Sequence, residues 1–131
     1  MSRGTITAQA FPLSTGAQYY PTTPLSATTA NLVMTTGDAT AGHVTAIVDG
    51  KTVVIAQNTG VGARTITFTS VVDVQNRKGD ITAYSIVAGG LATFGPFKQA
   101  YWNQSSPAGL WIDVSHAEVL LAVVTLPATG S

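Results

Sequence analysis

The stretch Lys-Thr-Val-Val-Ile-Ala-Gln, residues 51–57, indicates how the rest of this chain folds. Side chains alternate between the two faces of a strand, so Val53 and Ile55 share one face. Val54 and Ala56 share the opposite face. Both faces are then mostly apolar, which is typical of a packed strand that is covered on both sides. The stretch therefore predicts a central strand of a β-sandwich.

Turn-forming residues stand on both sides of this strand. Asp49-Gly50 precedes it, and the glycine-containing residues 58–62 follow it. Asp-Gly accepts the positive φ values that a tight hairpin turn requires. We therefore expect its neighbours to be residues 43–48 and 64–69, reached through these two short turns.

Strand patterns continue along the chain, with turn signals between them and no strong helical period. The clearest is residues 64–69, in which Ile66 and Phe68 face inward and threonines face outward. Gly95-Pro96 interrupts another, which indicates an edge strand or a strand end. The candidate strands are residues 31–36, 43–48, 51–57, 64–69, 81–87, 91–97, 110–114 and 118–126.

About eight short strands predict an all-β protein with a single β-sandwich. A jelly-roll-like strand order is one of several that remain open. The expected core consists of apolar residues from three of the strands, namely Val53, Ile55, Ile66, Phe68, Leu121 and Val123. A chain of 131 residues is expected to form one domain, here residues 31–131, preceded by an extended arm over residues 1–30.

The composition is poor in charge, with 45% apolar and only 9% charged residues. A free soluble monomer usually carries more charge on its surface. The composition favours a protein whose surface is largely covered by partners, and a charge-poor secreted β-domain is the alternative. The six Lys and Arg residues are scattered, so we expect no nucleic-acid partner.

Export and membrane signals are not expected. The chain has no cysteine, so it has no disulfide framework. No apolar segment follows Arg3, so we expect a protein made and used without Sec export. The longest apolar run, residues 119–124, is too short to span a bilayer, so no membrane partner is expected.

The predicted arm is rich in Thr, Ser, Ala and Pro, and its prolines exclude a long helix. It nevertheless carries apolar and aromatic residues that disordered tails usually lack, namely Phe11, Leu13, Tyr19, Tyr20 and Leu25. The arm could fold back on its own domain or lie on a neighbouring subunit. We expect it to contact a neighbour, and these five residues are the main candidates for partner binding.

No catalytic pattern stands out. Asp113, Ser115 and His116 are close in sequence but lie in a poor geometry for a triad, so we expect local backbone bonds from Asp113 and Ser115. No metal-ligand spacing links the possible ligands His43, His116, Asp113 and Glu118, and Asp73 and Asp80 are expected to be solvated loop carboxylates. We expect neither an enzyme, nor a cofactor, nor a metal site.

Two loops are secondary candidates for binding. Residues 70–80 include Arg77 and Lys78, where much of the charge is concentrated. Residues 98–108 include Tyr101 and Trp102 beside amide side chains, which suits sugar stacking. The alternative is that these aromatic residues close one end of the sandwich.

Several segments in order resemble small β-sandwich structural proteins of tailed bacteriophages, of the head decoration (cement) type encoded near the major capsid gene. They are Thr52-Val-Val-Ile-Ala-Gln-Asn58, Arg64-Thr-Ile-Thr-Phe68, Gly79-Asp-Ile-Thr82, Phe94-Gly-Pro-Phe97, Tyr101-Trp-Asn-Gln104, Leu110-Trp-Ile-Asp113 and Val123-Val-Thr-Leu-Pro127. The resemblance covers roughly residues 51–127 and excludes the arm.

The resemblance implies a non-enzymatic virion protein on the outer surface of the capsid. Its partners would be the major capsid protein and its own copies in a homo-oligomer, for which a trimer is favoured. Such proteins hold neighbouring capsid subunits together against internal DNA pressure. A tail or neck component and a carbohydrate-binding β-sandwich module are the alternatives.

Overall fold

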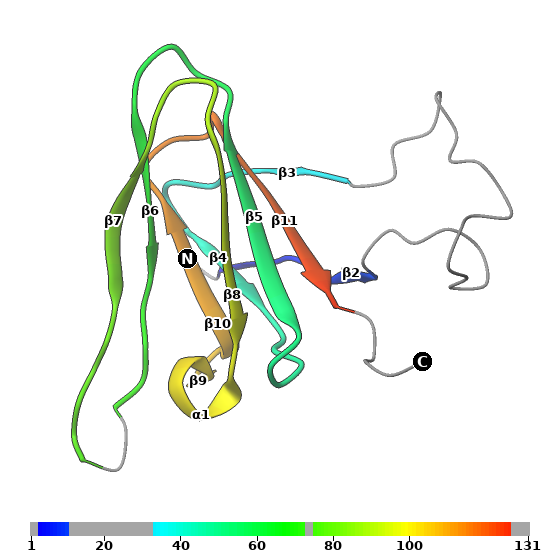
Figure 1. The fold of residues 1–131 in the computed structure, drawn as a ribbon, viewed down its shortest axis with the longest axis vertical. Coiled ribbons are helices and arrows are strands. Elements are labelled where there is room, and N and C mark those ends of the chain that lie inside the picture. The colour runs from blue at the N-terminus through cyan, green and yellow to red at the C-terminus, as the bar shows by residue number, and fades with distance from the viewer. Residues whose placement is uncertain (1–2, 11–32, 73–74, 127–131) are drawn as a thin grey trace, which may run out of the picture.

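Two β-sheets pack face to face in the computed structural model, which describes residues 3–10, 33–72 and 75–126 (Figure 1). The first sheet runs in the order β1 (Gly4–Thr5), β4 (His43–Thr45), β10 (Ala108–Val114), β6 (Arg64–Phe68) and β7 (Ile81–Ile86), with β9 (Gln104–Ser105) beside β10. The second runs in the order β2 (Gln9–Ala10), β11 (Val119–Thr125), β5 (Thr52–Asn58) and β8 (Leu91–Phe97), with β3 (Thr35–Thr36) beside β11. One short helix, α1 (Gln99–Trp102), follows β8. The prediction of an all-β sandwich is confirmed.

Strand β5 is central in its sheet, but its neighbours are not those expected. It pairs antiparallel with β11 along all seven residues and with β8 on its other side. The prediction that residues 43–48 and 64–69 flank it is wrong. The turns before and after β5 each carry the chain from one sheet to the other. At the first turn the Gly50 N–H bonds to the Phe97 carbonyl of β8 at 2.9 Å, not to β4.

The two faces of β5 differ in burial. Val54 and Ala56 are fully buried in the core, whereas Val53 and Ile55 are half-buried on the outer face. The prediction that Val53 and Ile55 belong to the core is therefore wrong. Because both faces are apolar, the sequence pattern did not distinguish them. The other four predicted core residues are fully buried, namely Ile66, Phe68, Leu121 and Val123.

Aromatic rings fill the centre of the sandwich. The Phe68 ring of β6 lies 4.8 Å from the Phe94 ring and 5.2 Å from the Phe97 ring, both on β8. These contacts join the two sheets, and tilted ring pairs at such distances stabilise a core beyond their area burial. The Gly95-Pro96 pair lies in β8, which is the last strand of its sheet, so the predicted edge position is confirmed.

Residues 3–10 of the predicted arm lie on the sandwich itself. Strand β1 pairs parallel with β4, and β2 pairs parallel with β11, so the two short strands extend both sheets. Between them, Ile6 is 5% exposed and belongs to the core. The remainder of the arm, including Phe11, Leu13, Tyr19, Tyr20 and Leu25, lies outside the described residues.

Candidate functional site

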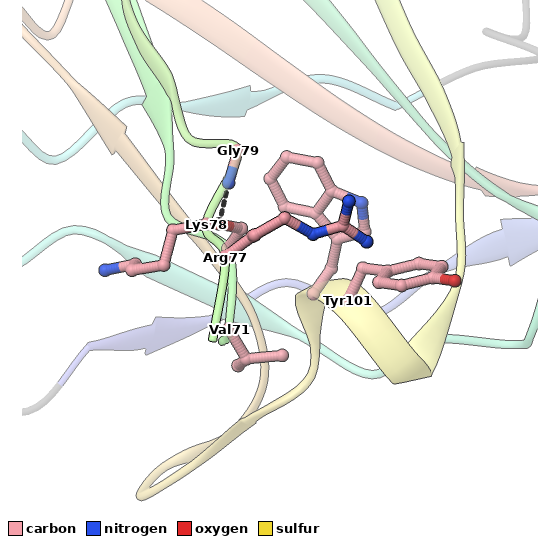
Figure 2. Close-up of a pocket in the computed structure, with 7 residues that line it drawn as sticks. Val71, Arg77, Lys78, Gly79 and Tyr101 are labelled. Atoms are coloured by element: carbon pink, nitrogen blue, oxygen red, sulfur yellow. Dashed lines mark hydrogen bonds between the residues drawn. The ribbon is translucent and has the colours of Figure 1, made fainter. Parts of the chain in front are cut away.

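The two predicted binding loops meet at one end of the sandwich. Arg77 and Lys78 from one loop and Tyr101 and Trp102 from α1 line a pocket of about 390 Å³ (Figure 2). Its other lining residues are Ser70, Val71 and Gly79. We call this the Arg77–Tyr101 pocket. The four loop residues singled out in the sequence are thus brought together, although 23 positions and two strands, β7 and β8, separate the two pairs.

The loop that carries the cations is closed at its base by Ser70 and Asp80. The Ser70 N–H and hydroxyl both donate to the Asp80 carboxylate, at 2.8 and 2.7 Å. The Gly79 N–H in turn donates to the Ser70 hydroxyl at 2.9 Å. These bonds to the ionised carboxylate, chiefly from the Ser70 hydroxyl, hold the pKa of Asp80 below its ordinary value. The hydrogen bonds between Ser70 and Asp80, ten residues apart in the sequence, therefore hold the two ends of the loop together.

The helix side of the pocket is anchored to the same loop. The Val71 N–H donates to the Tyr101 carbonyl at 2.7 Å. The Gln104 side-chain amide donates to the Thr69 carbonyl at 2.9 Å, so β9 is held against the end of β6. The Trp102 ring meets the Phe97 ring edge-on at 5.1 Å and is half-buried. Trp102 therefore closes this end of the core, whereas the Tyr101 side chain is 50% exposed.

The cations of the pocket point in different directions. Figure 2 shows the Arg77 side chain extending toward the helix that carries Tyr101, whereas Lys78 points away from it. Arg77 donates to the Gln75 side chain at 3.2 Å, and Lys78 lies 3.8 Å from the Asp80 carboxylate. Guanidinium groups recognise carboxylates and stack on aromatic rings. Arg77 and Tyr101 thus bring a guanidinium group and an aromatic ring to the same pocket.

The residues considered for a hydrolytic triad have separate partners. The Asp113 carboxylate accepts two hydrogen bonds from the Arg3 guanidinium, at 2.9 and 3.1 Å. The expected local backbone bond of Asp113 is thus wrong. The Ser115 hydroxyl accepts the N–H of Thr65, 50 positions away, at 2.9 Å, so the expected local backbone bond of Ser115 is wrong as well. This bond ties the end of β10 to β6. The His116 Nδ1 atom faces the Glu118 N–H in the β10–β11 turn.

The residues considered as metal ligands are engaged in the fold. The His43 Nε2 atom accepts the Asp38 N–H at 2.8 Å, and burial lowers the pKa of His43. Across residues 3–10, 33–72 and 75–126, no three His, Cys, Asp or Glu side chains are grouped to hold a metal ion. Asp80 is bonded to Ser70, and Asp73 lies outside the described residues.

A second pocket was not predicted from the sequence. It has a volume of about 460 Å³ and is lined by Arg3, Thr5, Ala41, Val44, Ser106, Pro107 and Trp111. The Arg3 guanidinium lies 4.4 Å from the centre of the Trp111 ring while it also bonds Asp113. Its charge is therefore compensated, and its role is to fix the N-terminal strand to β10. Residues 108 positions apart form this contact, and no local pattern signals it.

The chain was compared with protein families, curated proteins and solved structures. No protein-family model, curated protein or solved structure matches the chain. In the part of the chain that the structure describes, no helix has the length and apolar character needed to cross a bilayer. The chain's own surfaces and the resemblance in its sequence are therefore the observations that bear on its function.

Proposed function

We propose that this chain is a non-enzymatic structural protein of a tailed-bacteriophage virion. In this role it binds the outer surface of the capsid as a decoration (cement) protein. The partners are the major capsid protein and further copies of the chain. The proposal draws on the resemblance over residues 51–127, on the β-sandwich fold and on the low charge of the chain.

The observation that carries this proposal is the Arg77–Tyr101 pocket. Its two loops are fastened to each other by the Val71–Tyr101 bond, so the binding surface exists before a partner arrives. A preformed surface loses little conformational entropy on binding. Arg77 and the half-exposed Tyr101 are of the residue types that contribute most to protein interfaces.

A repeating shell also explains how a small pocket can suffice. One pocket of this size provides a modest contact area, well below that of a stable protein interface. On a lattice, many such contacts act together and raise the overall avidity. A charge-poor surface can be buried between subunits without a large desolvation cost.

The finer expectation for the fold, a jelly-roll-like arrangement, is part of this proposal. It is supported by the position of the last two long strands, because β10 lies beside β4 and β11 lies beside β5. Strands late in the chain thus return to pair with early ones, as they do in Greek-key topologies.

Substitutions in the pocket test the proposed role. Replacing Arg77 and Tyr101 together with alanine removes a cation and an aromatic ring without touching the core. We expect at least about tenfold weaker binding to expanded capsids, measured by cosedimentation, since truncation of a hot-spot Arg or Tyr costs about 2 kcal/mol or more. Lys51→Ala, which removes a cation outside the pocket, is the control. Equal binding by the double variant and the control would contradict a role of this pocket.

Carbohydrate binding is the second candidate, and the half-exposed Tyr101 ring favours it. The Gln104 amide, however, is already bonded to the Thr69 and Ser70 carbonyls, so it is occupied within the fold. Saturable binding to a defined oligosaccharide that Tyr101→Ala abolishes would favour this alternative. A tail or neck position is distinguished by labelling virions with an antibody to the chain.

A further inference from the structure

The second pocket lies on the outer face of the first sheet. In β10, Leu110 and Ile112 are fully buried in the core, so Trp111 between them points outward. Trp111 is half-buried and lines this pocket, whose volume of about 460 Å³ lies in the range of small-molecule sites, roughly 300–1,000 Å³. We call it the Trp111 pocket. It shares no lining residue with the Arg77–Tyr101 pocket.

The guanidinium group of Arg3 lines this pocket with part of its hydrogen-bonding capacity unused. Its Nη1 and Nη2 atoms donate to the Asp113 carboxylate at 2.9 and 3.1 Å. Nη1 also faces the His43 and Ile112 carbonyls, at 3.3 and 3.5 Å. A guanidinium group has five N–H donors in a fixed fork geometry. Among the described residues nothing accepts from Nε or from the second N–H of Nη2, and these two N–H groups form a second fork.

The neighbours of Arg3 hold this second fork in place. A Cβ atom at Gly42, whose φ is +74°, would lie 2.5 Å from both the Arg3 Nη1 atom and an Asp113 carboxylate oxygen, so the ion pair fits against a glycine. The guanidinium carbon also lies 4.4 Å from the centre of the Trp111 ring, a distance at which a cation is attracted to an aromatic face. A donor pair that is already oriented loses little entropy on binding.

Two hydroxyl groups complete the polar lining. Thr5 and Ser106 are exposed, and neither hydroxyl forms a hydrogen bond within the part of the chain that the structure describes. The Trp111 indole N–H already donates to the Pro107 carbonyl at 2.9 Å, so the ring offers apolar surface and no donor. The rest of the lining is apolar and consists of Ala41, Val44 and Pro107.

The second fork of Arg3 favours a ligand that holds two oxygen atoms side by side. A carboxylate or phosphate has such a pair, but its charge would meet the Asp113 carboxylate on the same guanidinium group. Successive carbonyls of an extended peptide point to opposite sides of the strand, so they do not form the pair. Two adjacent hydroxyl groups of a pyranose are a neutral pair of this kind. The C–H groups of the same sugar ring match the apolar surface of Trp111.

We propose that the Trp111 pocket binds a neutral pyranose unit of a glycan, whose adjacent hydroxyl groups accept the two N–H groups of the second fork of Arg3. Thr5 and Ser106 bond to its other hydroxyl groups, since a hydroxyl both donates and accepts. Asp113 is a positioning residue that orients Arg3 and compensates its charge. This inference goes beyond capsid binding and does not depend on it. It also places sugar recognition away from Tyr101.

The test is binding of the full chain to immobilised neutral oligosaccharides of glucose, galactose and mannose, beside matched oligosaccharides that contain glucuronic acid. We expect saturable binding to at least one neutral probe, and loss of binding after periodate has cleaved its adjacent hydroxyl groups. Binding only to the acidic probes would overturn the proposal. The absence of saturable binding to every neutral probe would overturn it as well.

Variants of the exposed hydroxyl groups locate the site without disturbing the core. Thr5→Ala and Ser106→Ala should each weaken binding of the same neutral probe by about threefold, measured by titration calorimetry. Thr82→Ala is the control, since Thr82 is an exposed threonine of β7 outside the pocket. Equal binding by all three variants would contradict the site. So would loss of sugar binding in Tyr101→Ala, which would place the sugar in the other pocket.

Two further variants test the roles of the ion pair. Arg3→Lys keeps the cation but has no fork, so binding should weaken by about tenfold or more. Asp113→Asn removes the compensating charge, so the preference should shift from neutral toward acidic probes, which simple loosening of the fold would not cause. An unchanged preference would contradict the positioning role of Asp113. Failure of these tests leaves capsid binding by the Arg77–Tyr101 pocket unaffected, because no capsid is present in them.

Discussion

The side-chain amide of Gln9 forms a two-bond pair with the backbone of Val33. Its nitrogen donates to the Val33 carbonyl at 2.6 Å, and its oxygen accepts the Val33 N–H at 2.9 Å. Gln9 belongs to β2, and Val33 lies just before β3, and both strands pair with β11. Gln9 and Val33, which flank residues 11–32 in the sequence, therefore lie side by side on the sandwich.

Removal of this pair should destabilise the base of that segment. We expect Gln9→Ala to lower the free energy of unfolding by about 1 kcal/mol, because two exposed hydrogen bonds are lost to water. Gln9→Glu keeps the acceptor but loses the donor, so it should fall between the wild type and Gln9→Ala. Urea unfolding followed by circular dichroism measures both. Equal stability of all three proteins would show that the pair contributes nothing.

The same geometry allows the segment to be removed cleanly. Because Gln9 and Val33 are in hydrogen-bond contact, residues 11–32 can be replaced by a short Gly-Ser linker without disturbing β1, β2 or Ile6. We expect a folded protein with a cooperative melt but weaker binding to expanded capsids, because the aromatic residues of the segment are the proposed contact with a neighbour. A linker variant that binds as tightly as the wild type would refute that contact.

Truncation of the central aromatic ring tests the core. Phe68 is fully buried between Phe94 and Phe97, so Phe68→Ala leaves a cavity that the two sheets cannot easily close. We expect a loss of about 3–5 kcal/mol in the free energy of unfolding. Tyr84→Ala, which removes a half-exposed ring from the same cluster, should cost less. Equal losses for the two variants would contradict the assignment of Phe68 to the centre of the core.

Stability should depend on pH through His43. Burial lowers the pKa of His43 in the folded state, so the unfolded chain binds a proton more readily than the folded chain. The contribution of neutral His43 is complete above the unfolded pKa of about 6.5 and is lost as pH falls from there through the folded pKa. Because one proton is involved, the free energy of unfolding should change by no more than about 1.4 kcal/mol per pH unit.

Urea unfolding at several pH values checks this dependence. His43→Gln should lose the slope between neutral and mildly acidic pH, whereas His116→Gln, which changes the exposed turn, should keep it. A wild-type protein whose stability is constant across this range would contradict the buried, neutral state of His43.

The sequence predicted the strands well because they depend on local alternation. Each of the expected strand ranges overlaps a strand of the structure, although the bounds of some strands differ by one or two residues. The buried residues of β6 followed directly from its alternating threonines. The sequence could not resolve the two apolar faces of β5, since the choice between them depends on which sheet lies opposite. The residues of the two turns beside β5 are typical of hairpins, yet both turns lead to the other sheet. The sequence could not reveal this, because the strands that pair with β5, namely β8 and β11, are distant from it in the chain.

The candidate site was predicted only in part. Charge and aromatic content singled out Arg77, Lys78, Tyr101 and Trp102, but not their convergence, which depends on the Val71–Tyr101 bond between loops. The Arg3–Asp113 pair joins the beginning of the chain to β10 and had no local signal. The strands formed by residues 3–10 were missed because two-residue strands have no periodicity to detect.

The most direct test of the central proposal is cosedimentation of the full chain with expanded and unexpanded capsids of the same virus. The proposal predicts saturable binding to the expanded shell, at a fixed number of copies per capsid subunit, and a shell that resists heating better when saturated. It also predicts that the Arg77→Ala/Tyr101→Ala double variant competes poorly for the same sites. No saturable binding to the expanded shell by the well-folded wild-type chain would contradict the assignment as a decoration protein.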